Sequence, residues 1–152
     1  GVPAAGVPAA GVPAAGVPAA GVPAAGVPEG SWLIEPHAAI IRSGALAQYC
    51  REQGCEPIDP RIAYAWSAVM PPENPWHRRF RLLRVEPYQR KALQRIAAEL
   101  GFGPSTEIKK RGFPDTPEDV RARLKLTGTR RGVIFLTRRG EGEHLMLFGE
   151  RA

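Results

Sequence analysis

Beyond residue 30, runs of apolar residues and polar breaks predict alternating strands and helices in the first half of the chain. Residues 32–34 are apolar and predict a short strand. Residues 37–53 then carry apolar side chains at helical spacing, so we expect one helix that ends at Gly54, a residue suited to the left-handed end of a helix. Residues 63–69 predict a second strand, and the proline-rich segment after them predicts a loop.

The segment 79–87 alternates between apolar and basic residues, which is typical of a strand. Because neighbouring side chains in a strand point to opposite faces, we expect two sets along it. One set is Phe80, Leu82 and Arg84, and the other is Arg81, Leu83 and Val85.

The second half continues with two helices, one strand and a hairpin. Residues 88–101 predict a helix with an apolar stripe at 3–4 spacing, and residues 105–113 predict the next strand. Thr116 is suited to cap a further helix, with Pro117 in its first turn. The apolar runs 132–137 and 143–148 enclose a Gly-containing turn and predict a β-hairpin.

This order of elements predicts the fold class. Three helices alternate with strands, and the chain ends in two strands. We therefore expect an α/β (α+β) domain, in which about three helices pack against a small mixed sheet.

A different pattern fills the N-terminus, where GVPAA is repeated from residue 1 and a last copy stops at Pro28. Proline at every fifth position disfavours helix, and Val, Pro and Ala alone bury little surface. We expect a mobile, partly polyproline-like linker over residues 1–30, preceding one domain over residues 31–152. Replication slippage or an added tag would explain the repeat, and an elastomeric role is a third hypothesis for the chain.

Positive charge is concentrated in one window of the predicted domain. The chain has a net charge of +6, yet residues 78–111 hold ten basic and three acidic residues, a net of 10 − 3 = +7. If the strands 79–87 and 105–113 are neighbours, these charges merge into a surface that attracts phosphates. The candidate RNA contacts are Arg79, Arg81, Arg84, Lys109, Lys110 and Arg111, and the aromatic candidates for base stacking are Trp76, His77 and Tyr88. Codon bias alone is an alternative source of the arginines.

Signals of catalysis or cofactor binding are absent from the sequence, so we expect no catalytic and no cofactor-binding residue. There is no Gly-rich phosphate loop and no nucleophile beside a histidine. Glu35 and Glu86 each end a strand, and we expect them to cap the turn that follows rather than act as a catalytic pair. Two cysteines, at Cys50 and Cys55, do not make a zinc framework, and we expect both to be reduced. Without a metal site, a membrane span or a signal peptide, we expect a cytoplasmic protein.

Five segments in order resemble one family: WLIEPHAAIIRSGALAQYC, IDPRIAYAWS, FRLLRVEPY, EIKKRGFPDTPEDVRARLKLTG and GVIFLTR. They are similar to the THUMP-like domain at the C-terminus of certain bacterial class I S-adenosylmethionine-dependent methyltransferases. The likeness runs from about Trp32 to Phe148. His37 stands where relatives often carry Asp or Asn.

The resemblance implies a parent protein whose catalytic domain precedes this one and binds S-adenosylmethionine. It also implies a link to RNA, because THUMP-type domains hold structured RNA in RNA-modifying enzymes. We therefore expect an accessory domain that positions RNA by a basic surface. The alternative is a structural module that docks on the methyltransferase domain and stabilises it without binding RNA.

Overall fold

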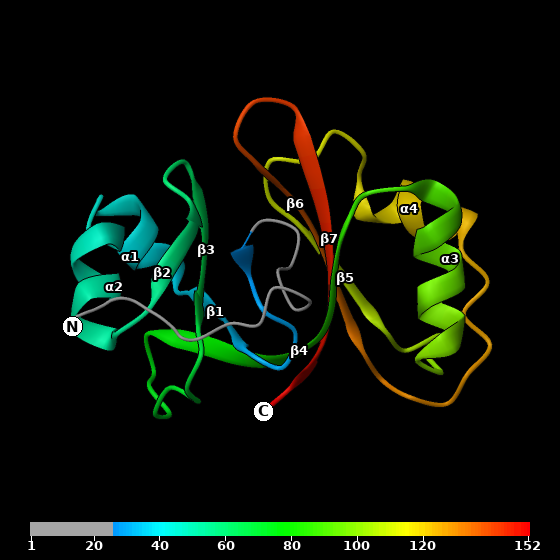
Figure 1. The fold of residues 1–152 in the computed structure, drawn as a ribbon, viewed down its shortest axis with the longest axis horizontal. Helices are drawn as coiled ribbons and strands as arrows, with labels where there is room; N and C mark the ends of the chain where they lie inside the picture. Colours follow the sequence, from blue (N-terminus) through cyan, green and yellow to red (C-terminus); the bar gives the residue numbers. More distant parts are fainter. Residues whose placement is uncertain (1–25) are drawn as a thin grey trace.

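The computed structural model describes residues 26–152, which fold into one seven-stranded sheet and four helices (Figure 1). The linker expected over the first 25 residues lies outside the described part. In chain order the elements are β1 (Trp32–Pro36), α1 (Ala38–Arg42), α2 (Leu46–Gln53), β2 (Glu56–Asp59), β3 (Ile62–Ser67), β4 (His77–Pro87), α3 (Arg90–Glu99), β5 (Glu107–Lys110), α4 (Pro117–Arg123), β6 (Val133–Arg139) and β7 (Glu143–Arg151).

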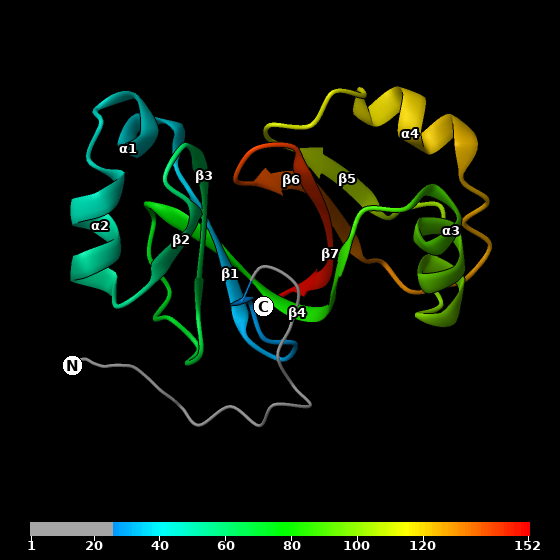
Figure 2. The same ribbon diagram turned by 45° about the horizontal axis from the view of Figure 1, so that its top comes forward.

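The sheet is mixed, as the order of elements predicted. Its strands lie in the order β2-β3-β1-β4-β7-β6-β5, with β5 and β6 parallel and every other pair antiparallel. The sheet rolls up, so that β2 and β3 come back into contact with β6. Figure 2 shows this roll, with the helices on its outer, convex side.

Each face of the rolled sheet has its own hydrophobic core. The concave face encloses Phe80, Leu82 and Phe135 among other apolar residues, with Tyr64 and Phe80 edge-to-face against Phe135. On the convex face, α3 and α4 pack over β6 and β7, while α2 packs over β1 and β3. The middle of the convex face, along β1 and β4, lies between the two groups of helices (Figure 1).

The helix expected over residues 37–53 is two helices. The chain breaks at Ser43 and Gly44, where Gly44 has a positive φ of 73°. The Nδ1 atom of His37 accepts a hydrogen bond from the Ala39 amide and caps α1, the role that Asp or Asn commonly fills. The strand β2 was missed, because Pro57 made its four residues look like a loop; this strand lies at the edge of the sheet, where proline is tolerated.

The predicted alternation along 79–87 was wrong in its second half. A β-bulge shifts the pairing of β4 with β7 between Leu82 and Arg84. Val85 therefore joins Phe80 and Leu82 in the concave core, and Arg84 lies on the outside of the sheet. A bulge adds one residue to one strand, which resets the period of two that the prediction assumed.

The last partial copy of the repeat contacts the domain. Val27 is fully buried in the concave core, and the Gly30 amide donates to the Leu82 carbonyl. Glu29 reaches the Arg84 guanidinium at 3.5 Å. The division between linker and domain at residues 30 and 31 stays a prediction, but packing against the domain already begins at Val27.

Candidate functional site

The six predicted RNA contacts do not form one continuous patch. The strands β4 and β5, which carry them, are separated by β7 and β6, so the condition for merging their charges is not met. The six side chains instead fall into separate environments. Whether any of them contacts RNA stays a prediction.

Arg79 and Arg81 lie on the part of β4 that no helix covers. Arg81 is exposed, and its guanidinium lies 5.8 Å from the ring centroid of Trp32. Arg79 donates from Nη1 to the Pro71 carbonyl at 2.7 Å. Neither guanidinium has a carboxylate within 4.0 Å among residues 26–152, so both keep their charge uncompensated.

Arg84 is in the opposite situation. Its guanidinium lies within 3.5 Å of the carboxylates of Glu29, Glu86 and Glu99. The hydrogen bond that Arg84 donates to Glu86 is the main cause that raises the pKa of Arg84 above its ordinary value. Arg84 is therefore surrounded by negative charge and is poorly placed to hold a phosphate.

Lys109 and Arg111 bridge the rolled sheet from β5 to β1. The Nζ atom of Lys109 lies 3.2 Å from both carboxylate oxygens of Glu35, and Arg111 Nη2 lies 3.8 Å from the same group. Arg111 also donates to the Ala63 carbonyl, and its guanidinium lies over the Tyr64 ring at 4.8 Å. The carboxylate of Glu35 thus orients two cations. We had expected it to cap the turn after β1, and this expectation was wrong.

The remaining predicted residues divide into exposed and buried groups. Lys110 is exposed and donates to the Phe113 carbonyl. Trp76 is 49% exposed and stands edge-on to His37. In contrast, His77 is buried, and Tyr88 packs against Phe113, so Trp76 is the one of the three aromatic candidates that presents an open side chain.

Buried His77 holds the start of β4 against α2. Its Nδ1 lies 2.6 Å from the Tyr49 hydroxyl and its Nε2 lies 3.1 Å from the Pro72 carbonyl. Because a carbonyl only accepts, Nε2 carries the proton and Nδ1 accepts from the tyrosine. Burial is the main cause that lowers the pKa of His77, so the imidazole is neutral at pH 7.

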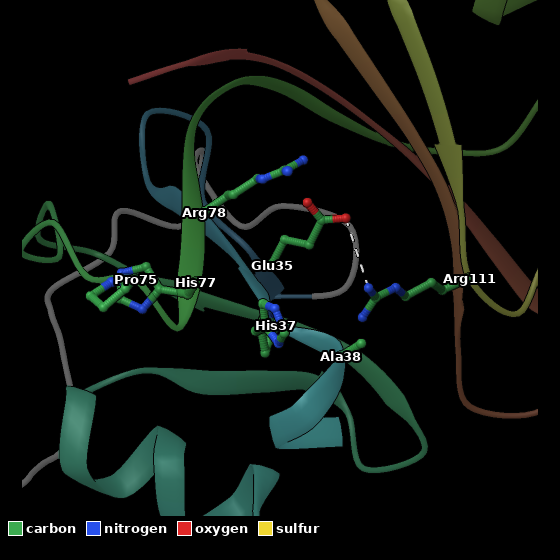
Figure 3. Close-up of a pocket in the computed structure, with 8 residues that line it drawn as sticks. Glu35, His37, Ala38, Pro75, His77, Arg78 and Arg111 are labelled. Carbon is green, nitrogen blue, oxygen red and sulfur yellow. Dashed lines mark ion pairs between the residues drawn. The ribbon is translucent and has the colours of Figure 1, made fainter. Parts of the chain in front are cut away.

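A pocket of about 360 Å³ opens beside Glu35. It is lined by Glu35, Pro36, His37, Ala38, Pro75, His77, Arg78 and Arg111. Figure 3 shows Arg78 and Glu35 extending toward the wall that carries Arg111. Sequence reasoning counted Arg78 but did not select it. The pairing of β1 with β4 would have identified Arg78 as a site residue, because it sets Arg78 directly opposite Glu35.

Other chemistry is sparse in the described part of the chain. Cys50 and Cys55 are both free and buried. Residues 26–152 contain no group of three or more His, Cys, Asp or Glu side chains that could hold a metal ion. Within the same range, every helix is too short or too polar to cross a bilayer.

Comparisons with known proteins agree with this architecture. Residues 77–151 match the family model described as THUMP domain-like. Over 113 residues the chain is 32% identical to an uncharacterized S-adenosylmethionine-dependent methyltransferase of Mycobacterium tuberculosis, found in strains CDC 1551 / Oshkosh and ATCC 25618 / H37Rv. The match covers 74% of this chain and 30% of each relative, so the chain spans less than a third of their length.

The fold is also found in a solved structure. A crystal structure of a candidate methyltransferase from Porphyromonas gingivalis W83 superposes with a TM-score of 0.66 at 23% identity. The superposition covers 80% of this chain and 29% of that one. The chain therefore carries a THUMP-like domain and is homologous to S-adenosylmethionine-dependent methyltransferases.

Proposed function

We propose that this chain is the accessory domain of an S-adenosylmethionine-dependent methyltransferase and that it positions structured RNA for the catalytic domain. The homology to proteins named as such methyltransferases supports the first part. In those relatives about two thirds of the length lies outside the match, which leaves room for a catalytic domain that binds S-adenosylmethionine. The RNA part rests on the charges of β4.

The observation that carries the RNA proposal is the uncompensated charge of Arg79 and Arg81. Both lie on β4, where Arg79 is paired with Ile34 and Arg81 with Trp32 of β1; Arg81 is exposed and Arg79 is partly buried. Arginine binds phosphate bidentately and stays charged at all physiological pH values. With Trp32 beneath Arg81, the surface offers both charge and an aromatic ring to a nucleic acid.

This arrangement suits recognition of the RNA backbone and shape. Phosphate contacts give affinity and position but carry no base information. Arg81 is exposed on the sheet surface, and Arg79 lines a pocket of about 210 Å³ with other charged residues. We therefore expect weak sequence preference and strong salt dependence.

Binding of a labelled RNA stem-loop to the full 152-residue chain, measured at several salt concentrations, tests the proposal. We expect the wild-type Kd to weaken with salt, and the double variant Arg79→Gln plus Arg81→Gln to reduce the slope of log K against log salt by about 2. Arg42→Gln plus Arg51→Gln removes the same charge from exposed positions of α1 and α2 and serves as the control. Equal losses in both variants, or no binding at low salt, would refute an RNA surface on β4.

A second candidate function is docking on the methyltransferase domain without RNA. The observation that favours it is that large apolar side chains are exposed in the loop before β4. Val69 is 74% exposed and Met70 is 52% exposed, and Trp76 closes the same loop. A contiguous exposed apolar patch often marks an interaction surface, whereas single scattered apolar residues are common on any protein surface.

Adding the catalytic domain of the parent protein in trans separates the two candidates. If docking is the function, Val69→Ser plus Met70→Ser abolishes complex formation, whereas the Arg79 and Arg81 double variant leaves it unchanged. If the domain serves RNA, the serine variants keep the stem-loop affinity of the wild type. Analytical ultracentrifugation measures the complex, and the RNA titration above measures the affinity.

A further inference from the structure

The pocket beside Glu35 has an excess of positive charge. The residues that give this charge are not Arg79 and Arg81, which carry the proposed RNA surface. Glu35 contributes one negative charge, while Lys109, Arg111 and Arg78 contribute three positive charges around it. The carboxylate is 13% exposed and is shared by Lys109 and Arg111. Arg78 has no carboxylate within 4.0 Å among the residues that the structure describes, although it is the β1–β4 pairing partner of Glu35.

Two cations are held in place before any ligand arrives: Arg111, which lines the pocket, and Lys109, which pairs with the lining residue Glu35. Arg111 is fixed on three sides, by the Ala63 carbonyl, by the Tyr64 ring and by Glu35. Lys109 is held by both oxygens of Glu35. Cations fixed in this way lose little side-chain entropy when an anion binds, which favours affinity.

The outer wall adds an unused donor. The Nδ1 atom of His37 accepts from the Ala39 amide, so the ring proton of neutral His37 is on Nε2. His37 lines the pocket together with Arg78. Arg78 and the His37 ring thus flank the opening, with Arg111 across from them (Figure 3).

The balance of charge indicates which anion fits. The four groups sum to 3 − 1 = +2, so a singly charged ligand would leave the pocket positive and a doubly charged one would neutralise it. A phosphate monoester carries about −1.5 to −2 at pH 7 and has three strong acceptor oxygens. The planar guanidinium groups of Arg78 and Arg111 match such oxygens in pairs.

We infer that this pocket binds a phosphate monoester, held between Arg78 and Arg111 with His37 at the rim. The monoester has two sources that share this chemistry, the phosphorylated end of an RNA strand and a free nucleoside monophosphate. The site differs from the surface proposed for the RNA backbone, because Arg79 and Arg81 do not line the pocket. The pocket recognises a terminal group, whereas the surface that carries Arg79 and Arg81 recognises internal phosphates.

Isothermal titration of the full chain with adenosine 5′-monophosphate, with adenosine and with inorganic phosphate tests the inference. We expect the monophosphate to bind at least tenfold more tightly than adenosine. The variant Arg78→Gln should weaken it about tenfold or more, whereas Arg51→Gln, which removes an exposed arginine of α2 outside the pocket, should change it less than twofold. Arg78 is exposed and has no ion-pair partner in the described part of the chain, so its variant should fold; thermal unfolding checks this.

A ten-nucleotide RNA with either a 5′-phosphate or a 5′-hydroxyl distinguishes the sources. Tighter binding of the phosphorylated strand that is lost in Arg78→Gln assigns the pocket to strand ends. Binding of the free monophosphate with no difference between the two strands assigns it to a small molecule. Equal affinity for adenosine and its monophosphate, together with no difference between the strands, overturns the inference, and does so even if both strands still bind in a salt-dependent manner through Arg79 and Arg81.

Discussion

Two carboxylates link the β2-β3-β1 part of the rolled sheet to its β6-β5 part, and they differ in what surrounds them. Asp59, 2% exposed, accepts from the amides of Gly140 and Arg61 and from the Arg61 side chain, and Arg61 is itself paired with Glu141. Glu35 is surrounded by more cations than it can neutralise, and a pocket lies next to it.

The difference teaches how to separate a structural ion pair from a binding site in this fold. The charges of Asp59, Arg61 and Glu141 sum to −1, and Asp59 accepts from two backbone amides and the Arg61 side chain. Around Glu35 they sum to +2 beside open space. The first cluster can only hold the fold together, while the second can do so and still attract an anion.

The largest effect is expected at Asp59. Asp59→Ala leaves the partly buried Gly140 and Arg61 amides without their acceptor, and each such loss costs about 1–3 kcal/mol. We expect the free energy of unfolding in urea at pH 7 to fall by about 3 kcal/mol. Glu56→Ala removes an exposed carboxylate from the same strand and should change it by less than about 0.5 kcal/mol. A loss equal to that control would show that Asp59 does not close the sheet.

A smaller loss in the free energy of unfolding is expected at acidic pH, because His77 is buried and neutral in the folded protein. The folded pKa of His77 lies below that of the unfolded chain, so the unfolded state binds more protons once the pH falls below about 6.5. Stability should therefore be complete above pH 6.5 and decline below it, by at most about 1.4 kcal/mol per pH unit from this group.

The variant His77→Gln isolates this contribution. Glutamine can accept from Tyr49 and donate to Pro72 but does not titrate, so urea midpoints between pH 5 and 6.5 should vary less in the variant than in the wild type. Parallel curves for the two proteins would mean that folding does not lower the pKa of His77.

Arg84 provides the reverse of the Glu35 cluster, with three carboxylates around one cation. Arg84→Met removes the positive charge and leaves Glu29, Glu86 and Glu99 to repel one another. Because these pairs are partly exposed, we expect a modest loss of about 1 kcal/mol in the free energy of unfolding. RNA affinity should stay within twofold of the wild type; a loss as large as that of the Arg79 and Arg81 variant would place Arg84 in the RNA surface.

The sequence was informative where apolar periodicity is regular. It predicted the fold class, the hairpin of β6 and β7, and the Thr116 cap of α4, whose hydroxyl accepts from the Asp119 amide. These features depend on residues close together in the chain. The break at Gly44 and the bulge after Leu82 were missed, because a single helix and an unbroken strand fit the same pattern equally well.

The candidate site was harder to predict, because charge neutralisation depends on distant residues. Lys109 and Glu35 are 74 positions apart, and Arg84 and Glu29 meet only because the end of the repeat packs on the domain. The net charge summed over a stretch of sequence, such as residues 78–111, cannot show which cations are paired with carboxylates. Pairing of β1 with β4 was the missing information that would have selected Arg78.

The most direct test of the central claim is the affinity of Glu35→Gln for adenosine 5′-monophosphate, compared with that of Asp59→Asn. The substitution of Glu35 removes the one negative charge that offsets the nearby cations, while the glutamine carbonyl oxygen can still accept from Lys109 and keep it in place. We predict that it tightens binding about threefold to tenfold at low salt, while Asp59→Asn leaves the affinity unchanged. Weaker or unaltered binding in Glu35→Gln would contradict the account, since the excess positive charge around Glu35 would then play no part in holding an anion.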